Sequence, residues 1–532
     1  MTMRQNSALH HFLLVLLSVA LLSLGWLGGT GLTLLVALIP LLVISENLSD
    51  SKRDWWRMAL WASLAFLLWH AATIWWVWIA TPLGPITAGI VGSFYNLCAI
   101  MAYHYTSKRA PRALAYTLLA TIWIATEWAY TSADVMTFPW LLLGHGFSTD
   151  TWAVQWYEYT GIFGGTLWAL CSNIAIFEIM RTRTTTSKVR AGLIAIVPII
   201  LSLILLLTYT PSERTTEISV LQPNVPCYED ERAQAGKQDP TEDIKRLISQ
   251  VPQSSTFVLM PESALAYIPQ IGGSIDERQF GFYSSLFGDI IAENLPSTKL
   301  ITGASTLVRY GEVKATDTAH HYPNYGWYDQ YNSALLINNE GSVEDIYHKG
   351  RLVIGVEAVP LKNIFDAFEV DLGGVSGQLG WGKEHTLFSH NDILIGPSIC
   401  YEGLYGDYFR GFARNGAEVM ALISNDGWWG NTPGHKRLFD FCRLRAIETR
   451  RSIARSANTG ISGFISPTGS TIGERLTWDE QGILTAEVEL RDDKTIYTLY
   501  GDWIARIATY VAVLAILYFI AYRVRKRNHL VD

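Results

Sequence analysis

Charged residues are scarce in this chain: aspartate, glutamate, lysine and arginine together make up 17% of its 532 residues. They are scarcest before residue 210, where aliphatic residues and tryptophan predominate. Aromatic residues reach 12% of the chain, which is unusual for a protein that faces water on all sides. The composition therefore excludes a uniformly water-soluble protein and predicts a membrane-embedded part.

Cysteine is also rare, and its five copies show no pairing pattern. Cys98 and Cys171 lie in apolar segments, whereas Cys227, Cys400 and Cys442 are scattered through the more polar part of the chain. The absence of CxxC and CxxH spacings excludes a disulfide framework and a cysteine-based zinc site. No other cluster of metal ligands stands out, so we predict no metal and no cofactor.

Apolar segments recur along the first 210 residues and appear once more near the end. They cover 11–24, 31–45, 56–79, 85–105, 114–131, 160–180, 191–209 and 503–522. A helix needs about 20 apolar residues to cross a bilayer, and the first two segments reach that length only with their flanking residues. We predict eight spans, with a more polar region between the seventh and the eighth.

Basic residues are absent from alternate connections between these segments. The connections at 25–30, 80–84 and 132–159 contain no lysine or arginine. The other connections and the two termini contain fifteen lysine and arginine residues. This count includes the ends of the flanking apolar segments. Because cytoplasmic loops are enriched in Lys and Arg, this asymmetry places both termini inside and residues 211–500 outside.

Residues 211–500 alternate short β-rich runs with helical stretches. Strands are predicted at 217–222, 256–260, 299–304, 333–338, 393–399, 419–424, 452–456, 461–466 and 483–489. Helices are predicted near 241–250, 276–294, 402–415 and 434–450. Several runs are apolar without alternation, which indicates strands buried on both faces. The pattern predicts a layered α/β sandwich with active groups at strand ends.

The same region is acidic, since acidic residues outnumber basic ones by 13 between 211 and 500. A net negative charge of this size opposes binding to nucleic acid. It also opposes simple electrostatic adhesion to anionic lipid. We therefore predict no nucleic-acid partner.

Three strand-end residues have the chemistry of a covalent catalyst. Cys400 closes the apolar run 393–399, Glu262 follows the run 256–260, and Lys349 follows a strand-like stretch that ends at 346. A thiolate nucleophile needs a base to take its proton and a cation to stabilise the anion, roles that suit Glu262 and Lys349. Taken singly, the three could instead be a buried structural thiol, a helix-capping carboxylate and a surface lysine.

The motifs around these residues resemble the Glu-Lys-Cys triad of the nitrilase (carbon–nitrogen hydrolase) superfamily. They read Pro-Glu-Ser at Glu262, Tyr-His-Lys-Gly-Arg-Leu-Val at Lys349 and Ile-Cys-Tyr-Glu at Cys400. With the predicted spans, the chain resembles the apolipoprotein N-acyltransferase family over nearly its full length. Other similar stretches are Phe138-Pro139-Trp140-Leu141, Gln222-Pro223-Asn224, Asn425-Asp426-Gly427-Trp428-Trp429-Gly430 and 443–458.

The resemblance implies an α-helical polytopic membrane domain of eight spans plus an α/β nitrilase-like αββα sandwich. The implied domains are a seven-span membrane domain at 1–210, an extracytoplasmic catalytic domain at 211–500, and an eighth span with a basic cytoplasmic tail at 501–532. It also implies a multi-pass protein of the bacterial inner (plasma) membrane that works as a monomer, with its catalytic domain on the periplasmic side.

The implied activity is acyl transfer from a phospholipid to the α-amine of the diacylglyceryl-modified N-terminal cysteine of an apolipoprotein. Phosphatidylethanolamine is the expected donor, and the reaction is expected to be ping-pong through a thioester on Cys400. By the same resemblance, Lys349 and the backbone N–H of Tyr401 would form the oxyanion hole. Glu357 and Glu402 would orient the lysine and the cysteine loop.

Three further residues are candidates for an acyl pocket or lid. Trp428 and Trp429 could line such a pocket or belong to a plain turn. Tyr228 lies where the family has a tryptophan. The run 351–357 departs from the family's His-Leu-Val-Pro-Phe-Gly-Glu, although it keeps the final glutamate as Glu357. This departure concerns the shape of the lid and the preference for a donor.

Two other functions fit part of the sequence. A membrane-bound amidase or nitrilase would use the same three residues on a small amide, but it would need one span as an anchor rather than eight. A catalytically silent lipid-binding scaffold would have no need of the three residues together. Acyl transfer from a phospholipid accounts for both the spans and the triad.

Overall fold

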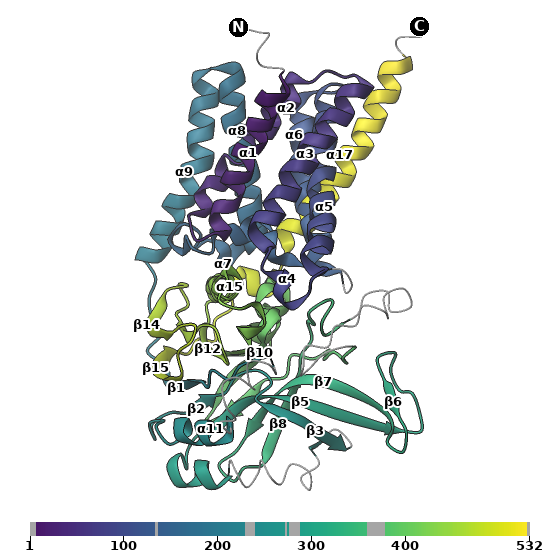
Figure 1. Cartoon of the computed structure of the whole chain (residues 1–532). Helices are drawn as coiled ribbons and strands as arrows, with labels where there is room; N and C mark the ends of the chain where they lie inside the picture. The colour runs from purple at the N-terminus through teal and green to yellow at the C-terminus, as the bar shows by residue number, and fades with distance from the viewer. Residues whose placement is uncertain are drawn as a thin grey trace. The chain divides into compact units, whose positions relative to one another are not determined.

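The computed structural model describes residues 7–133, 137–228, 240–271, 274–275, 288–358 and 378–528. The chain forms two compact units (Figure 1). The first comprises residues 1–78, 82–209 and 500–532, and the second comprises 79–81 and 210–499.

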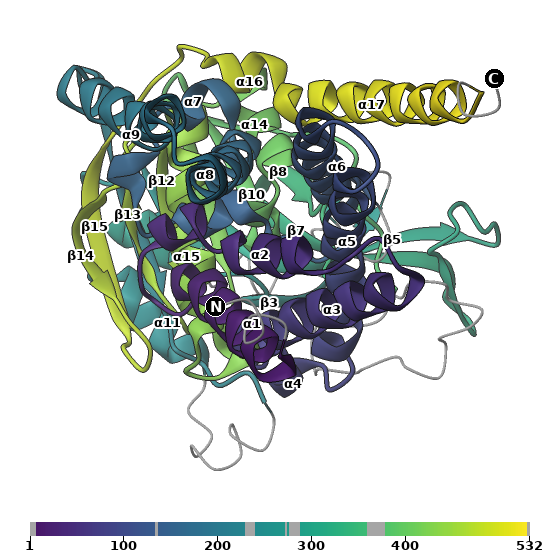
Figure 2. The same ribbon diagram turned by 90° about the horizontal axis from the view of Figure 1, so that it is seen from above.

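The first unit is helical, and six of its described helices are long and apolar enough to cross a membrane. They are α1 (Ala8–Ser23) with the 3-10 helix η1 (Leu24–Trp26) that continues it, α3 (Lys52–Ile74), α5 (Gly84–Ser107), α8 (Ile162–Thr182), α9 (Thr185–Leu207) and α17 (Trp503–Asn528). Helices α8 and α9 lie side by side in both ribbon views (Figure 1 and Figure 2). Six of the eight predicted spans thus coincide with helices whose length and composition suit a membrane.

The other two predicted spans have a different character. Residues 31–45 fold as a 3-10 helix, η2 (Gly31–Leu35), followed by the short helix α2 (Ile39–Asn47). Together these are shorter than the roughly 20 residues that a crossing helix needs. Helix α6 (Arg112–Ser132) is long enough but less apolar, because threonine, tyrosine and the buried Glu127 interrupt its aliphatic residues.

Glu127 ties α6 to two other segments of the first unit. Its Oε1 accepts hydrogen bonds from Trp123 Nε1 and from the backbone N–H of Leu143, both at 2.9 Å. Its Oε2 accepts one from Thr166 Oγ1 on α8 at 2.8 Å. Three donors, from α6, from the 3-10 helix η4 (Leu143–Phe147) and from α8, satisfy this buried carboxylate, which gives it a structural role.

The second unit contains two β-sheets. In the described residues, the larger sheet has nine strands: β1 (Thr215–Gln222), β2 (Phe257–Leu259), β3 (Leu265–Ile271), β4 (Ser274–Ile275), β5 (Lys299–Gly311), β6 (His320–Tyr322), β7 (Gly326–Ile337), β8 (Val343–His348) and β15 (Gly482–Glu489). The smaller sheet has six: β9 (Phe388–His390), β10 (Ile393–Ile399), β11 (Val419–Ser424), β12 (Ser452–Ala457), β13 (Ser462–Ile465) and β14 (Thr471–Leu476). Parallel neighbours β1–β2–β5 and β10–β11–β12 form their centres.

Helices pack on both sheets, and the sheets pack on each other. Helix α11 (Pro240–Ile248) packs through Leu247 and Ile248 onto Val258 and Leu300 of the larger sheet. Helices α14 (Gly406–Asn415) and α15 (Pro433–Thr449) contact β10 and β12 of the smaller sheet. Between the sheets, β1 contacts β12 and β7 contacts β10. This arrangement is the predicted αββα sandwich.

The predicted strands all coincide with strands of the structure, but the structure contains more. Residues 343–348 and 471–476 form β8 and β14, whose side chains are mostly exposed or half-buried. Such strands have no apolar run to reveal them. Strand β7 begins at Gly326, seven residues before the predicted start. Of the helix predicted at 276–294, residues 288–294 are helical and 276–287 lie outside the described residues.

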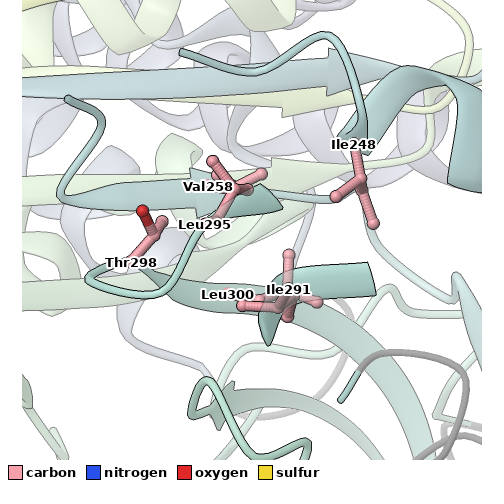
Figure 3. A pocket seen from close by; sticks show the side chains of 6 residues that line it. All are labelled: Ile248, Val258, Ile291, Leu295, Thr298 and Leu300. Atoms are coloured by element: carbon pink, nitrogen blue, oxygen red, sulfur yellow. The ribbon is translucent and has the colours of Figure 1, made fainter. Parts of the chain in front are cut away.

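A small hollow lies between α11 and the larger sheet. It is lined by Ile248, Val258, Ile291, Leu295, Thr298 and Leu300 (Figure 3). The hydroxyl of Thr298 is the one polar group among these side chains, and it donates to Ser255 O at 2.5 Å. The hollow therefore belongs to the apolar core and carries no catalytic chemistry.

Gly303 on β5 lies against the turn that carries Glu262. A Cβ at this position would be 2.5 Å from Glu262 Cα and 2.6 Å from the backbone N of Ser263. Only glycine allows strand and turn to approach this closely.

We expect Gly303→Ala to lower the stability of the folded chain by about 1–3 kcal/mol, the usual effect of overpacking. The measurement is the thermal or denaturant midpoint of the detergent-solubilised protein. Gly192→Ala is the control, because an added Cβ there meets no atom within 4 Å. An unchanged midpoint for Gly303→Ala would mean that the turn can move aside freely.

Candidate active site

The three predicted catalytic residues lie at strand ends in the second unit. Glu262 follows β2, Lys349 follows β8, and Cys400 follows β10 and begins the 3-10 helix η7 (Cys400–Leu404). The backbone N–H of Lys349 donates to Asn332 O on β7 at 2.8 Å. The three residues are 6%, 1% and 5% exposed. Their ionisable groups are therefore shielded from bulk water.

The side chain of Lys349 joins two carboxylates. Its Nζ is 3.0 Å from Glu262 Oε1 and 2.9 Å from Glu357 Oε1. Burial alone would lower the pKa of Lys349, but the negative charges of Glu262 and Glu357 outweigh burial and raise it. The lysine is therefore an ammonium ion, and Glu357 contacts it directly.

Asn332 on β7 completes this cluster. Its Nδ2 donates to Glu262 Oε1 and to Glu357 Oε1, both at 2.7 Å. The two carboxylates thus share one amide and one ammonium, which offset their mutual repulsion. Nothing in the sequence marks Asn332, because an asparagine shortly before the apolar run Ala334–Ile337 matches no motif.

The two carboxylate oxygens of Glu262 accept different numbers of hydrogen bonds. Oε1 accepts from Lys349 and Asn332, which fills both of its acceptor positions. Oε2 accepts from the backbone N–H of Asn425 at 3.0 Å, which leaves one acceptor position. That position can take a proton, as a general base must.

Cys400 lies in a strained turn between its strand and η7. Its φ of +48° is in the left-handed region, where residues with a Cβ are uncommon. Such strain persists only where the surrounding structure holds it, and it clusters at functional sites. Burial, followed by the charge of Glu262, raises the pKa of the Cys400 thiol well above its usual value, while Lys349 acts in the opposite direction. The resting group is thus a thiol that needs a base.

Glu402 links the lysine loop to the cysteine turn. Its Oε1 accepts from the backbone N–H of Gly350 at 2.7 Å and from the hydroxyl of Tyr347 at 2.6 Å. Its Oε2 accepts from the backbone N–H of Ile399 at 2.7 Å. Burial raises the pKa of Glu402 to about 7, against the effect of these hydrogen bonds. The side chain is fully buried and connects two segments that carry predicted catalytic residues.

The remaining predicted residues lie around this centre. Tyr401 is buried, and its ring packs against that of Tyr405 at 5.5 Å. The hydroxyl of Tyr228 donates to Trp428 O at 2.8 Å, and the two rings are perpendicular with centroids 5.8 Å apart. Trp429, which follows Trp428 in the chain, is buried.

The Tyr228–Trp428 pair is connected to the site through Asn425. Cys227 donates its thiol to Asn425 Oδ1 at 3.1 Å, and the backbone N–H of Asn425 donates to Glu262. Tyr228 directly follows Cys227, and Trp428 follows Asn425 by three residues. The structure therefore brings the two aromatic residues near the carboxylate end of the site.

The cluster holds a thiol, a carboxylate and a fixed ammonium ion, which are the types of group needed for acyl transfer through cysteine. Within the described ranges, no group of three or more His, Cys, Asp or Glu side chains could hold a metal ion. The positive charge beside Cys400 and Glu262 is supplied by Lys349.

We expect Asn332→Ala to destabilise the chain by about 1–3 kcal/mol, because the two carboxylates lose a shared buried donor. Alkylation of Cys400 should also change, since Glu262 is no longer held in place. Melting temperature and peptide mass spectrometry after alkylation measure the two effects. Asn339→Ala is the control, because this residue is exposed just beyond the same strand. Equal behaviour of the two variants would contradict the role of Asn332.

The chain matches two family models. Residues 249–495 match the carbon-nitrogen hydrolase family, and residues 13–175 match the apolipoprotein N-acyltransferase N-terminal domain. The first match covers Glu262, Lys349 and Cys400.

Curated relatives match over most of their length. The apolipoprotein N-acyltransferase of Chlorobaculum tepidum is 28% identical over 516 residues, which cover 91% of each chain. That of Bradyrhizobium diazoefficiens is 30% identical over 448 residues, 79% of this chain and 75% of its own. That of Gloeobacter violaceus is 23% identical over 513 residues, 92% and 90%. These matches cover both the helical unit and the sandwich. The chain therefore belongs to the apolipoprotein N-acyltransferase family.

Proposed function

We propose that this protein transfers an acyl chain from a phospholipid to the α-amine of the diacylglyceryl-modified N-terminal cysteine of an apolipoprotein, which completes lipoprotein maturation. The observation that carries the proposal is the buried contact of Lys349 with Glu262 beside Cys400. Membership of the N-acyltransferase family favours acyl transfer over hydrolysis of a small amide.

The first half of the reaction forms a thioester. Glu262 takes the proton of the Cys400 thiol, and the thiolate attacks the sn-1 ester carbonyl of the phospholipid. Lys349 and the backbone N–H of Tyr401 stabilise the oxyanion. When the ester bond breaks, the protonated Glu262 returns its proton to the departing alkoxide, and a lysophospholipid leaves.

The second half transfers the acyl chain to the amine. The neutral α-amine of the lipoprotein attacks the thioester carbonyl, and Glu262 takes a proton from its nitrogen. Collapse of the tetrahedral intermediate expels the thiolate, which regains the proton from Glu262. Exclusion of water favours the amine as acceptor, and the burial of all three residues supports this.

The surrounding residues have supporting roles. Glu357 and Asn332 hold the ammonium and Glu262 in place, and Glu402 holds the loops of Lys349 and Cys400 together. Tyr228, Trp428 and Trp429 contribute to an acyl pocket or lid, which the proximity of Trp428 to Asn425 supports.

The setting of the reaction is part of the same proposal. The chain crosses the bacterial inner membrane eight times, with a seven-span domain at 1–210 and the eighth span and cytoplasmic tail at 501–532. The asymmetry of lysine and arginine supports a periplasmic catalytic domain at 211–500. The donor is phosphatidylethanolamine, and the protein works as a monomer.

Intact mass spectrometry after incubation with phosphatidylethanolamine tests the function. We expect the wild-type protein to gain the mass of one acyl chain, because the thioester accumulates without an acceptor amine. Cys400→Ala should show no adduct, whereas Cys442→Ala, a buried thiol on α15, should keep it. Release of ammonia from small amides without an adduct would favour the amidase, and neither result would favour the scaffold.

We expect Glu262→Gln to slow adduct formation about 100-fold or more, since an amide cannot take the thiol proton. Rate measurement by quenched intact mass, with circular dichroism as the folding control, checks this. Lys349→Ala is less suitable, because it leaves two buried carboxylates without their cation and lowers stability as well. A near-normal rate for Glu262→Gln would remove this carboxylate from the mechanism.

A further inference from the structure

Ser424 lies directly across from Cys400. Strands β10 and β11 are parallel, and Ile399, the last residue of β10, pairs with Ile423, so that Cys400 and Ser424 each directly follow a residue of this pair. Ser424 is fully buried. Strand β11, which ends at Ser424, contacts η7, which begins at Cys400, and the Ser424 side chain lowers the pKa of the Cys400 thiol, against the effects of burial and Glu262. The end of β11 thus places a buried hydroxyl next to the cysteine turn.

A buried ion pair lies behind this serine. The Ser424 hydroxyl donates to Asp426 Oδ1 at 2.6 Å. Nη2 of Arg455 on β12 donates to both oxygens of Asp426, each at 2.9 Å. Asp426 and Arg455 are both fully buried. Neither residue takes part in the acyl transfer described above.

A hydroxyl has one proton and can donate in only one direction at a time. While Cys400 is a thiol, the Ser424 proton points to Asp426, and the serine oxygen can accept the S–H. Once the sulfur is ionised, the strongest acceptor within reach is the thiolate. Asp426 can release the serine proton, because Arg455 still satisfies both of its oxygens.

We propose that Ser424 stabilises the Cys400 thiolate by turning its hydroxyl from Asp426 to the sulfur, with Asp426 and Arg455 as positioning residues. No covalent bond to Ser424 forms or breaks, and the thiol proton still goes to Glu262. The inference deepens the proposed function, because it concerns the nucleophile of that reaction.

The charges around the sulfur explain why a neutral donor has an effect. The charged groups that face Cys400 are Glu262, Lys349, Asp426 and Arg455. At the sulfur, the positive charges of Lys349 and Arg455 oppose the negative charges of Glu262 and Asp426. A hydrogen bond from Ser424 to the sulfur then shifts the protonation equilibrium of Cys400 toward the thiolate.

The pH dependence of Cys400 alkylation tests the inference in the full-length, detergent-solubilised protein. Iodoacetamide reacts with the thiolate, and peptide mass spectrometry separates Cys400 from the other four cysteines. We expect Ser424→Ala to alkylate about tenfold more slowly at a given pH, as for loss of a hydrogen bond to a charged group. Its profile should shift upward by about one pH unit.

Two further comparisons separate the hydroxyl from packing. Ser424→Thr and Ser424→Val have nearly the same shape, and only the first keeps the hydroxyl, so we expect threonine to react faster than valine. Ser456→Ala on β12 is the control, because its hydroxyl donates to Leu221 O at 2.7 Å, away from the sulfur. Its profile should match the wild type.

Equal alkylation profiles for the threonine and valine variants would overturn the inference, as would a wild-type profile for Ser424→Ala. If Ser424→Ala does not fold, the threonine–valine pair decides the question alone. Alkylation requires no phospholipid. A missing acyl adduct with a shifted alkylation profile would therefore contradict the proposed function and leave the role of Ser424 intact.

Discussion

The buried ammonium of Lys349 is the group on which the rest of the site depends. It lies between Glu262 and Glu357, and Asn332 bridges the same two oxygens. Removing charges from water is unfavourable, and it is tolerated only where the geometry is good and the remaining donors are used. Four side chains from three separate segments therefore have to meet. Loss of any one leaves a buried charge without compensation.

The two sheets contribute different parts of the site. The larger sheet supplies Glu262, Asn332 and Lys349 from the ends or interiors of β2, β7 and β8. The smaller sheet supplies Cys400 after β10 and Ser424 at the end of β11. Cys400 and the Glu262–Lys349 pair therefore come from different sheets, and the packing of the two sheets brings them into one site. Glu402 strengthens this junction, because one carboxylate accepts hydrogen bonds from both the lysine loop and the residue before Cys400.

The burial of Cys400, Glu262 and Lys349 has two chemical consequences. It raises the pKa of the Cys400 thiol, and in the reaction proposed above it keeps water away from the thioester. The left-handed backbone of Cys400 and the close approach of Gly303 to the Glu262 turn show that the local geometry is tightly constrained. A site of this kind has little freedom to rearrange, and its hydrogen bonds are made before substrate enters.

The sequence by itself determined the main strands, because buried strands are apolar runs, and Cys400 and Glu262 follow such runs. It also predicted the membrane-embedded part, although residues 31–45 and α6 are less suited to crossing a bilayer than their apolar composition suggested. Only the tertiary structure decided that Asn332 bridges Glu262 and Glu357, that Glu402 joins two loops, and that Ser424, Asp426 and Arg455 lie behind the thiol. The physical reason is that hydrogen bonds between strands distant in the chain depend on register and packing, and neither leaves a local signature in residue order.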